Sequence, residues 1–232
     1  MAVLNRESLY INSGNESVLD LVQPGDRRIL DVGCGAGNTG ELIRGYFPET
    51  EVVGITCSIA EQEAAAARLS QCFCLDLEKD NFECLGYNYD LLIFAHVLEH
   101  LVDPVACVER LLPHLKPQGR IVIALPNVAN WRSRFQLALG RFEYTESGVM
   151  DKTHLHFYTY HTAAKYLVEP IPQLRLEYLG VNGALPLGWF RHRLLGDRWR
   201  QAIDRWGCNK FPNFCGSEIL MVARHANSIY FS

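Results

Sequence analysis

The chain has 232 residues, of which 48% are hydrophobic and 21% charged, and its formal net charge is −4 at pH 7. This composition is ordinary for a soluble globular protein, and the length suits one α/β domain with a sizeable core. The negative charge argues against a nucleic-acid partner, because such proteins usually carry a basic face. The N-terminus lacks a signal-peptide pattern, and no apolar run approaches the roughly 20 residues that span a bilayer. We therefore expect a cytoplasmic protein without membrane contact.

The eight cysteines are consistent with a reducing compartment. No pair of Cys-x-x-Cys knuckles is present, so we expect no structural zinc site. Two cysteines, Cys208 and Cys215, fall in a turn-rich region. The others lie in or beside segments that we interpret as buried: Cys34, Cys57, Cys72, Cys74, Cys84 and Cys107. We expect all eight to be reduced thiols.

Short apolar runs alternate with helical patterns in the first part of the chain. The runs predict buried strands at 27–33, 51–56, 72–77, 89–95 and 119–126. The segments between them predict helices at 39–47, 58–70 and 103–115. Ser58 and Asp103 are good N-caps, and Pro104 suits the first helical position. Repeated strand–helix–strand units indicate a parallel sheet with helices on both faces.

The pattern changes after Pro126. A helix ending at Gly140 is followed by a polar loop, a further helix and two late strands, which we place at 161–169, 174–181 and 217–223. One domain accounts for residues 1–232, with three additions to the sheet. These are an N-terminal cap at 1–26, an insertion over the active-site cleft at 127–160, and an amphipathic segment at 185–212.

The amphipathic segment places four apolar residues near one helical face: Leu195, Trp199, Ile203 and Trp206. Arginines occupy most of the other positions. A basic amphipathic helix can lie on a membrane. More often its apolar stripe packs on the domain while the charges remain solvated. We interpret this segment as a packing element or a lid over the substrate.

The stretch ILDVGCGAGNTG (29–40) places Gly33, Gly35 and Gly37 directly after a strand and before a helix. At such a turn the backbone bends sharply and approaches a ligand closely. Dinucleotide sites use G-x-G-x-x-G. Here the third glycine comes one residue early, which disfavours a nicotinamide cofactor.

Three further motifs follow in register: LDLE (75–78), YDLLIFAHVLEHLVDP (89–104) and LKPQGRIVIALPN (115–127). Together with the glycine loop they resemble the class I S-adenosylmethionine-dependent methyltransferases, over about residues 10–225. Within that superfamily the chain is most similar to the branch of ubiquinone-type O-methyltransferases and MetW-like proteins. The resemblance implies a Rossmann-like three-layer sandwich. Its seven-stranded sheet would be mostly parallel, with a reversed C-terminal hairpin.

The resemblance also implies where S-adenosyl-L-methionine would bind. Asp31 and the three glycines would form the loop around its methionine and ribose part. Asp76 and Leu77 would lie at the adenine, and Ala95 and His96 would flank the methionyl portion. Ligands of open α/β sheets bind at the carboxyl ends of parallel strands, which is the same place.

The second strand departs from the family pattern. It ends in Thr56, where an acidic residue normally binds the ribose hydroxyls. A threonine hydroxyl cannot offer two acceptors to a diol. A strand end of this form resembles cyclopropane-synthase-like methyltransferases, and Gln62 could supply the second contact. The alternative is that cofactor binding has weakened or been lost.

His96, Glu99 and His100 match H-x-x-E-H, the inverted zinc-protease pattern. That chemistry requires both histidines on one long helix. Here His96 directly follows a strand, so we expect no zinc hydrolysis and assign no metal. We expect Glu99 and His100 to orient the loop at the cofactor's edge.

The segment GVMDKTHLHFYT (148–159) contains two histidines one residue apart. If it is extended, Leu155 and Phe157 face inward while His154 and His156 stand on the polar face. In the resembled branch a similar segment lies on the substrate side of the cleft. Methyl transfer to a hydroxyl needs alignment and a group that takes the proton, and neutral histidine suits that role.

We therefore propose His154 as the base, with Asp151 or Thr153 fixing its tautomer. His156 is the second candidate and His100 the third. A purely structural role, in which these histidines hold the insertion together, remains an alternative. Thr159 is predicted to cap the following helix.

The sequence thus predicts an S-adenosylmethionine-dependent methyltransferase that acts on a small molecule, at a hydroxyl of a sugar, phenol or natural product of secondary metabolism. Candidate substrate residues come from the cap and the insertion: Tyr10, Trp131, Arg132, Phe142 and Tyr144. N- or C-methylation on the same fold remains open. So do a non-catalytic MetW-like partner protein and a homodimer.

Overall fold

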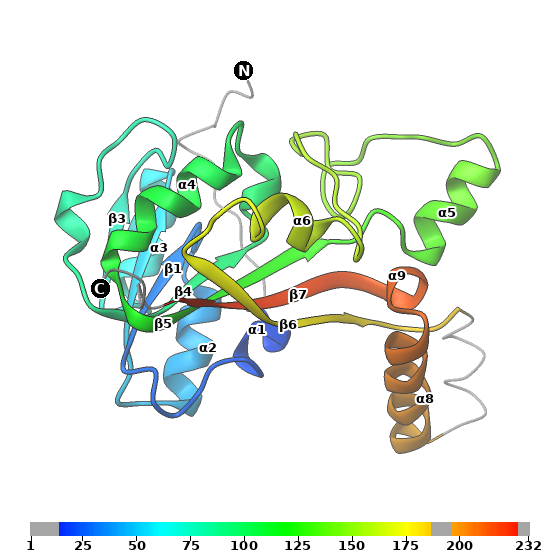
Figure 1. Ribbon diagram of the computed structural model, residues 1–232, viewed down its shortest axis with the longest axis horizontal. Helices are drawn as coiled ribbons and strands as arrows, with labels where there is room; N and C mark the ends of the chain where they lie inside the picture. Colours follow the sequence, from blue (N-terminus) through cyan, green and yellow to red (C-terminus); the bar gives the residue numbers. More distant parts are fainter. Residues whose placement is uncertain (1–13, 187–195, 227–232) are drawn as a thin grey trace, which may run out of the picture.

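The computed structural model describes residues 14–186 and 196–226 of the chain. Its centre is a seven-stranded sheet of order β3-β2-β1-β4-β5-β7-β6, which runs across the middle of Figure 1. The strands are β1 (Arg28–Val32), β2 (Glu51–Thr56), β3 (Gln71–Cys74), β4 (Tyr89–Ala95), β5 (Leu115–Pro126), β6 (Leu174–Gly183) and β7 (Gly216–His225). The first five are parallel, and β7 lies antiparallel between β5 and β6. The predicted Rossmann-like fold with its reversed C-terminal hairpin is confirmed.

Helices cover both faces of the sheet (Figure 1). The α-helices are α1 (Glu16–Leu19), α2 (Asn38–Tyr46), α3 (Ile59–Ala66), α4 (Pro104–Leu111), α5 (Trp131–Ala138), α6 (Ala163–Leu167), α8 (Asp197–Lys210) and α9 (Pro212–Cys215). Short 3₁₀ turns lie at η1 (Glu83–Leu85), η2 (Leu98–His100) and η3 (Leu112–His114). One apolar core lies between the sheet and α1, α2 and α3, and a second lies between the sheet and α4 and α6. This is the three-layer arrangement expected for buried parallel strands.

Local signals explain where the helices begin. The Ser58 side chain accepts a hydrogen bond from Glu61 N at the start of α3, and Asp103 caps α4 in the same way. Both predicted N-caps are therefore confirmed. The predicted cap at Thr159 is wrong, because α6 begins at Ala163 with Thr162 as its N-cap.

A buried ion pair ties the start of the sheet to its centre. Arg120 on β5 donates to Asp26, which lies before β1, and the two side chains are 5% and 6% exposed. Arg120 also donates to the Leu21 carbonyl. Asp26 in turn accepts from Gln23 N. These contacts fasten the N-terminal segment beneath the sheet.

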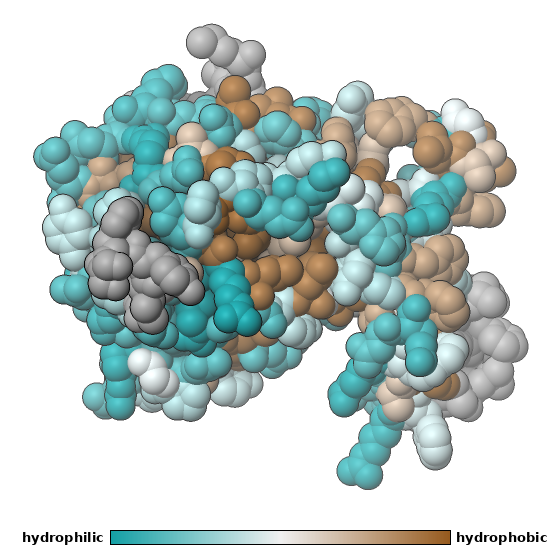
Figure 2. All heavy atoms as spheres, in the orientation of Figure 1, coloured by the Kyte–Doolittle hydropathy of each residue, from teal (hydrophilic) through white to brown (hydrophobic). Residues whose placement is uncertain are grey.

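The segment from β5 to α6 leaves the sheet and returns to it. Asn127 and Tyr158 form an isolated bridge at its base, and Val128 N donates to the Tyr158 carbonyl. Apolar residues gather over this region at the upper right of Figure 2. Exposed members include Phe135, Leu137, Leu139, Phe142 and Tyr144.

Helix α8 differs from its predicted packing. Trp199 and Trp206 are 70% and 55% exposed, and the face that α8 buries is formed by Gly207 and Cys208. Two members of the predicted apolar stripe are therefore exposed, Ile203 is half-buried, and the first member, Leu195, lies outside the described residues. A leucine side chain, that of Leu185, lies where a Cβ on Gly207 would be, so the glycine permits the close approach.

Every cysteine falls within the described residues, and all eight are free thiols. Cys208 and Cys215 are buried in α8 and α9 rather than placed in open turns, whereas Cys84 is exposed. Within the described parts of the chain, no helix has both the length and the apolar character required to cross a bilayer.

Candidate active site

The glycine loop joins β1 to α2 at the carboxyl edge of the sheet. Gly33, Gly35 and Gly37 have φ values of 76°, 53° and 82°, a region that side chains with a Cβ rarely adopt. Gly33 N and Cys34 N both donate to the Ile55 carbonyl of β2. A Cβ on Gly33 would lie 2.7 Å from Val97 Cγ2, so the loop packs directly against the chain that leaves β4.

Asp31 lies beneath this loop and is 2% exposed. Its Oδ2 has no hydrogen-bond partner among the described residues. Burial raises the pKa of the carboxyl to about 7. A cationic ligand at the loop would satisfy this carboxylate. S-adenosylmethionine carries both a sulfonium and an ammonium group, so the residues present fit that cofactor.

Thr56, at the end of β2, is buried and donates its hydroxyl hydrogen to the carboxylate of Glu61. Glu61 is itself 8% exposed and comes from the first turn of α3. Gln62, the predicted ribose contact, instead donates from Nε2 to the Cys72 carbonyl of β3, over 2.9 Å. An acidic side chain therefore does lie at the end of β2, but it comes from the helix. The Ser-x-x-Glu capping pattern at Ser58 was the available signal for it.

Asp76 and Leu77 follow β3, which ends at Cys74 rather than at 77 as predicted. Asp76 accepts hydrogen bonds from Lys79 Nζ at 2.7 Å and from Glu78 N at 3.0 Å. The hydrogen bond from Lys79 lowers the pKa of this carboxyl. Leu77 is buried in the core cluster next to α4. Both residues lie at the carboxyl edge, beside β2.

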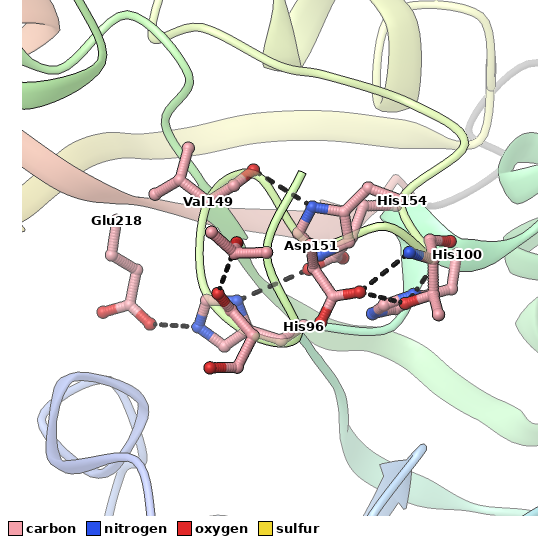
Figure 3. A network of polar contacts seen from close by, with 10 residues as sticks. His96, His100, Val149, Asp151, His154 and Glu218 are labelled. Carbon is pink, nitrogen blue, oxygen red and sulfur yellow. Dashed lines mark hydrogen bonds and ion pairs between the residues drawn. The ribbon is translucent and has the colours of Figure 1, made fainter. Parts of the chain in front are cut away.

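Ala95 and His96 occupy the end of β4. His96 has a φ of 56°, a conformation unusual for a residue other than glycine. Its Nε2 lies 2.8 Å from Glu218 Oε1 on β7, and its Nδ1 lies 3.5 Å from Glu99 Oε1 (Figure 3). Burial opposes the charged form, but these two carboxylates outweigh it and raise the pKa of His96 to about 10. His96 is thus the cation between two acids.

Three side chains lie close together next to His96. Glu99 and His100 belong to η2, and His154 belongs to the loop before α6. We call these three residues the polar centre. Glu99 is 0% exposed, and neither carboxylate oxygen has a hydrogen-bond partner among the described residues. The rings of His100 and His154 have centroids 4.7 Å apart. His154 Nε2 lies 3.9 Å from Glu99 Oε1.

The loop that carries His154 folds back as turns and is not extended, which corrects the predicted arrangement of 152–158. Leu155 N and His156 N both donate to the Glu99 carbonyl. As a result the His154 side chain is 5% exposed, whereas Leu155 and Phe157 are 47% and 38% exposed. The predicted inward and outward faces are reversed.

The remaining candidates for proton transfer lie around the polar centre. Thr153 donates its hydroxyl hydrogen to Asp151 at 2.6 Å, and His100 Nδ1 lies 3.0 Å from the same hydroxyl oxygen. Asp151 therefore supports His100 through Thr153 and not His154 as predicted. His156 lies outside the centre, with Nε2 3.4 Å from the Val102 carbonyl. Burial lowers the pKa of His154.

The described candidate substrate residues lie on α5 and on the loop that follows it. Trp131 Nε1 donates to the Ala184 carbonyl, and the Arg132 guanidinium lies 5.3 Å from the centroid of the Trp131 ring. Phe142 and Tyr144 are exposed and pack edge to face. A cavity of about 260 Å³ lies between α5 and the following loop, and Phe142 is part of its wall. Tyr10 lies outside the described residues.

Comparison with known proteins identifies this arrangement. The family model described as "Methyltransferase domain" matches residues 5–169, the larger part of the chain. Trans-aconitate 2-methyltransferase of Yersinia pestis (strain Pestoides F) is 34% identical over 100 residues, which are 43% of this chain and 38% of that protein. The enzyme of the same name from Methylobacterium radiotolerans is 36% identical over 103 residues, 44% of this chain and 38% of its own length. The matches thus span about two fifths of these curated relatives.

Solved structures share the fold. The plantazolicin methyltransferase BpumL, in complex with a triazolic desmethylPZN analog and S-adenosylhomocysteine, has a TM-score of 0.58 at 20% identity and covers 91% of this chain and 81% of its own. A SAM-dependent methyltransferase from Archaeoglobus fulgidus has a TM-score of 0.57 at 17% identity, covering 90% and 93%. The chain therefore belongs to the methyltransferase domain family.

Proposed function

We propose that this methyltransferase methylates a hydroxyl group of a small-molecule acceptor. The observation that supports the proposal is the polar centre of Glu99, His100 and His154, which lies at the end of β4 beside the glycine loop. When bound, S-adenosylmethionine supplies a methyl carbon on a sulfonium. Its transfer to a hydroxyl forms a C–O bond, breaks the S–C bond and releases one proton. A hydroxyl acceptor therefore needs a polar group near the methyl donor that accepts this proton. In this proposal the polar centre supplies that group.

In this proposal the cofactor lies along the carboxyl ends of β1, β2 and β4. The glycine loop approaches its methionine part, and the Asp31 carboxylate balances its positive charge. Glu61, held by Thr56, accepts from the ribose hydroxyls, since a carboxylate offers the two acceptors that a diol requires. Asp76 and Leu77 lie at the adenine. These positions lie at or after the carboxyl ends of strands, where open α/β sheets bind ligands.

The segment between β5 and α6 would bind the acceptor. The aromatic residues Trp131, Phe142 and Tyr144, with Arg132, suit a planar or partly apolar molecule. The relatives named for trans-aconitate support a small organic acceptor. Eight free thiols support a reducing compartment such as the cytoplasm. The net charge of −4 gives no support to a nucleic-acid acceptor.

The acceptor class can be tested with labelled cofactor. The purified chain is incubated with methyl-labelled S-adenosylmethionine and panels of phenols, sugars, carboxylic acids and amines, and the site of the methyl group is determined by mass spectrometry and NMR. The proposal predicts products methylated at a hydroxyl oxygen. Products methylated only at nitrogen, carbon or a carboxylate would overturn it. If the chain binds S-adenosylhomocysteine but methylates nothing in any panel, the non-catalytic alternative replaces it.

A further inference from the structure

The Glu99 carboxylate is buried and lacks hydrogen bonds among the described residues, although the cationic His96 stands 3.5 Å from it. The Glu99 side chain is 0% exposed, and both carboxylate oxygens lack hydrogen bonds within the described ranges 14–186 and 196–226. A buried carboxylate that accepts no hydrogen bond is unfavourable, and buried polar groups in folded proteins nearly always have a hydrogen-bond partner. The nearest nitrogens, His96 Nδ1 at 3.5 Å and His154 Nε2 at 3.9 Å, stand at ion-pair distance and not at hydrogen-bond distance.

The hydrogen bonds of His154 fix which of its nitrogens is available. Its Nδ1 lies 3.2 Å from the Val149 carbonyl, which can only accept a hydrogen bond. Nδ1 therefore carries the hydrogen, and in the neutral ring Nε2 keeps its lone pair. This is the nitrogen that faces Glu99. Figure 3 shows the Val149 carbonyl pointing at the His154 ring.

The hydrogen bonds of His100 determine in the same way which of its ring nitrogens carries the hydrogen. The Thr153 hydroxyl donates to Asp151, so its oxygen accepts from His100 Nδ1 at 3.0 Å. The Thr153 carbonyl lies 3.3 Å from the same nitrogen and is also an acceptor. His100 Nδ1 is therefore the protonated nitrogen. Its Nε2 retains a lone pair.

The side chains of Glu99, His100 and His154 also lie close together. One ligand atom from each of Glu99, His100 and His154 lies within 4.8 Å of the other two. The supporting contacts have the form found around metal ligands, in which each histidine donates its other N–H to a carbonyl or to a carboxylate-linked group. For His154 that group is the Val149 carbonyl, and for His100 it is Thr153 with Asp151.

We propose that the polar centre binds one divalent transition-metal ion, such as Zn²⁺, Co²⁺, Mn²⁺ or Fe²⁺, through Glu99, His100 and His154. Two nitrogens and one carboxylate match the preferences of these ions, whereas Mg²⁺ and Ca²⁺ prefer all-oxygen sites. Three protein ligands leave coordination positions for water or substrate. Because Val97 packs on Gly33, the ion would lie beside the cofactor loop. There it would hold an oxygen of the acceptor, and this role rests on the proposed function.

A competing explanation uses His96. His96 lies between Glu218 and Glu99, and its positive charge could balance Glu99 without any ion. The two explanations differ in what they require of His154. Charge balance by His96 needs no contribution from His154, whereas the metal site loses a ligand when His154 is changed.

Metal binding can be measured directly. The full chain, stripped with a chelator, is titrated with Co²⁺ and Zn²⁺, and binding is followed by the visible absorption of Co²⁺ and by calorimetry. We expect one ion per chain, at least about 100-fold weaker binding of either ion in Glu99→Gln and His154→Ala, and about 10- to 100-fold weaker binding in Thr153→Val, which removes the support of His100. His156→Ala is the matched control on the same loop and is expected to bind as the wild type does.

Failure to bind either ion, or equal binding by the wild type, Glu99→Gln and His154→Ala, would overturn the metal site. If the variants do not fold, anomalous diffraction from wild-type crystals grown with Zn²⁺ decides, and density away from these three side chains contradicts the proposal. Binding of S-adenosylhomocysteine is measured in the same preparations. Cofactor binding without metal binding refutes this inference alone, and metal binding without cofactor binding refutes the proposed function.

Discussion

Glu99 Oε1 and His154 Nε2 lie 3.9 Å apart, although one residue belongs to the turn after β4 and the other to the loop before α6. The backbone holds them there, because Leu155 N and His156 N both donate to the Glu99 carbonyl. The loop 149–156 is thereby fixed to the carboxyl edge of the sheet. Any change that releases this loop should alter the polar centre before it alters the sheet.

Substitution of Gly33 by alanine should destabilise the protein and weaken cofactor binding. Gly33 has a φ of 76°, and an added Cβ would lie 2.7 Å from Val97. Gly140 has a φ of 71° but open space around it, so Gly140→Ala measures the backbone strain alone, about 1–2 kcal/mol. We expect Gly33→Ala to cost about 1–3 kcal/mol more than this control in urea unfolding. Equal costs would show that Val97 does not press on the loop.

The stability of the cofactor-free protein should depend on Asp31 between about pH 4 and pH 7. Burial raises its pKa from 3.8 in a model peptide to about 7. In that interval the native state holds a proton that the unfolded state has released, so the free energy of unfolding falls as pH rises. The contribution is about 1.4 kcal/mol per pH unit. The difference between the wild type and Asp31→Asn isolates this slope, and a difference that stays constant with pH would contradict it.

The buried ion pair of Asp26 and Arg120 should be far more important than an exposed pair. Removal of one partner from a buried pair leaves an unpaired charge and typically costs about 3–5 kcal/mol. We therefore expect Arg120→Met to lower the free energy of unfolding by this amount. Arg224 pairs with Glu177 at the surface, where both side chains are about one third exposed, so Arg224→Met should cost less than about 1 kcal/mol. Similar losses in the two variants would refute the distinction.

Glu61 should bind the ribose hydroxyls of the cofactor. Glu61→Gln keeps a hydrogen bond to Thr56 but removes one of the two acceptors, so we expect about 10- to 100-fold weaker binding of S-adenosylhomocysteine in calorimetry. Glu63→Gln, an exposed position on the same helix, is the control. The analogue lacking the ribose hydroxyls should bind the wild type and Glu61→Gln with nearly equal affinity. Discrimination against this analogue that persists in the variant would place the ribose elsewhere.

The parts of the fold that depend on short stretches of sequence were predicted from the sequence. Ser58 and Asp103 cap the helices that they were expected to cap. The glycine spacing after β1 indicated a strand–turn–helix unit, and Gly33, Gly35 and Gly37 have the positive φ values that such a turn requires. These features follow from propensity and backbone geometry within a few residues. They do not depend on contacts with distant parts of the chain.

The parts that depend on distant contacts were not predicted. The alternation of 152–158 suggested a strand, but the hydrogen bonds to Glu99 bend this segment and turn His154 inward. From the H-x-x-E-H pattern we expect no metal, only that Glu99 and His100 orient the loop at the cofactor's edge. The structure instead groups Glu99 and His100 with His154, a residue from another loop. Trp199 and Trp206 were also not predicted correctly. Helical periodicity shows that apolar residues share one face of a helix, but it does not show what packs against that face.

A crystal structure with S-adenosylhomocysteine would show whether the glycine loop and the polar centre form one active site. We expect the ligand along the carboxyl ends of β1, β2 and β4, with its amino group near Asp31, its ribose on Glu61 and its sulfur facing the polar centre. A ligand bound away from the glycine loop, or one whose sulfur points away from the polar centre, would contradict this expectation.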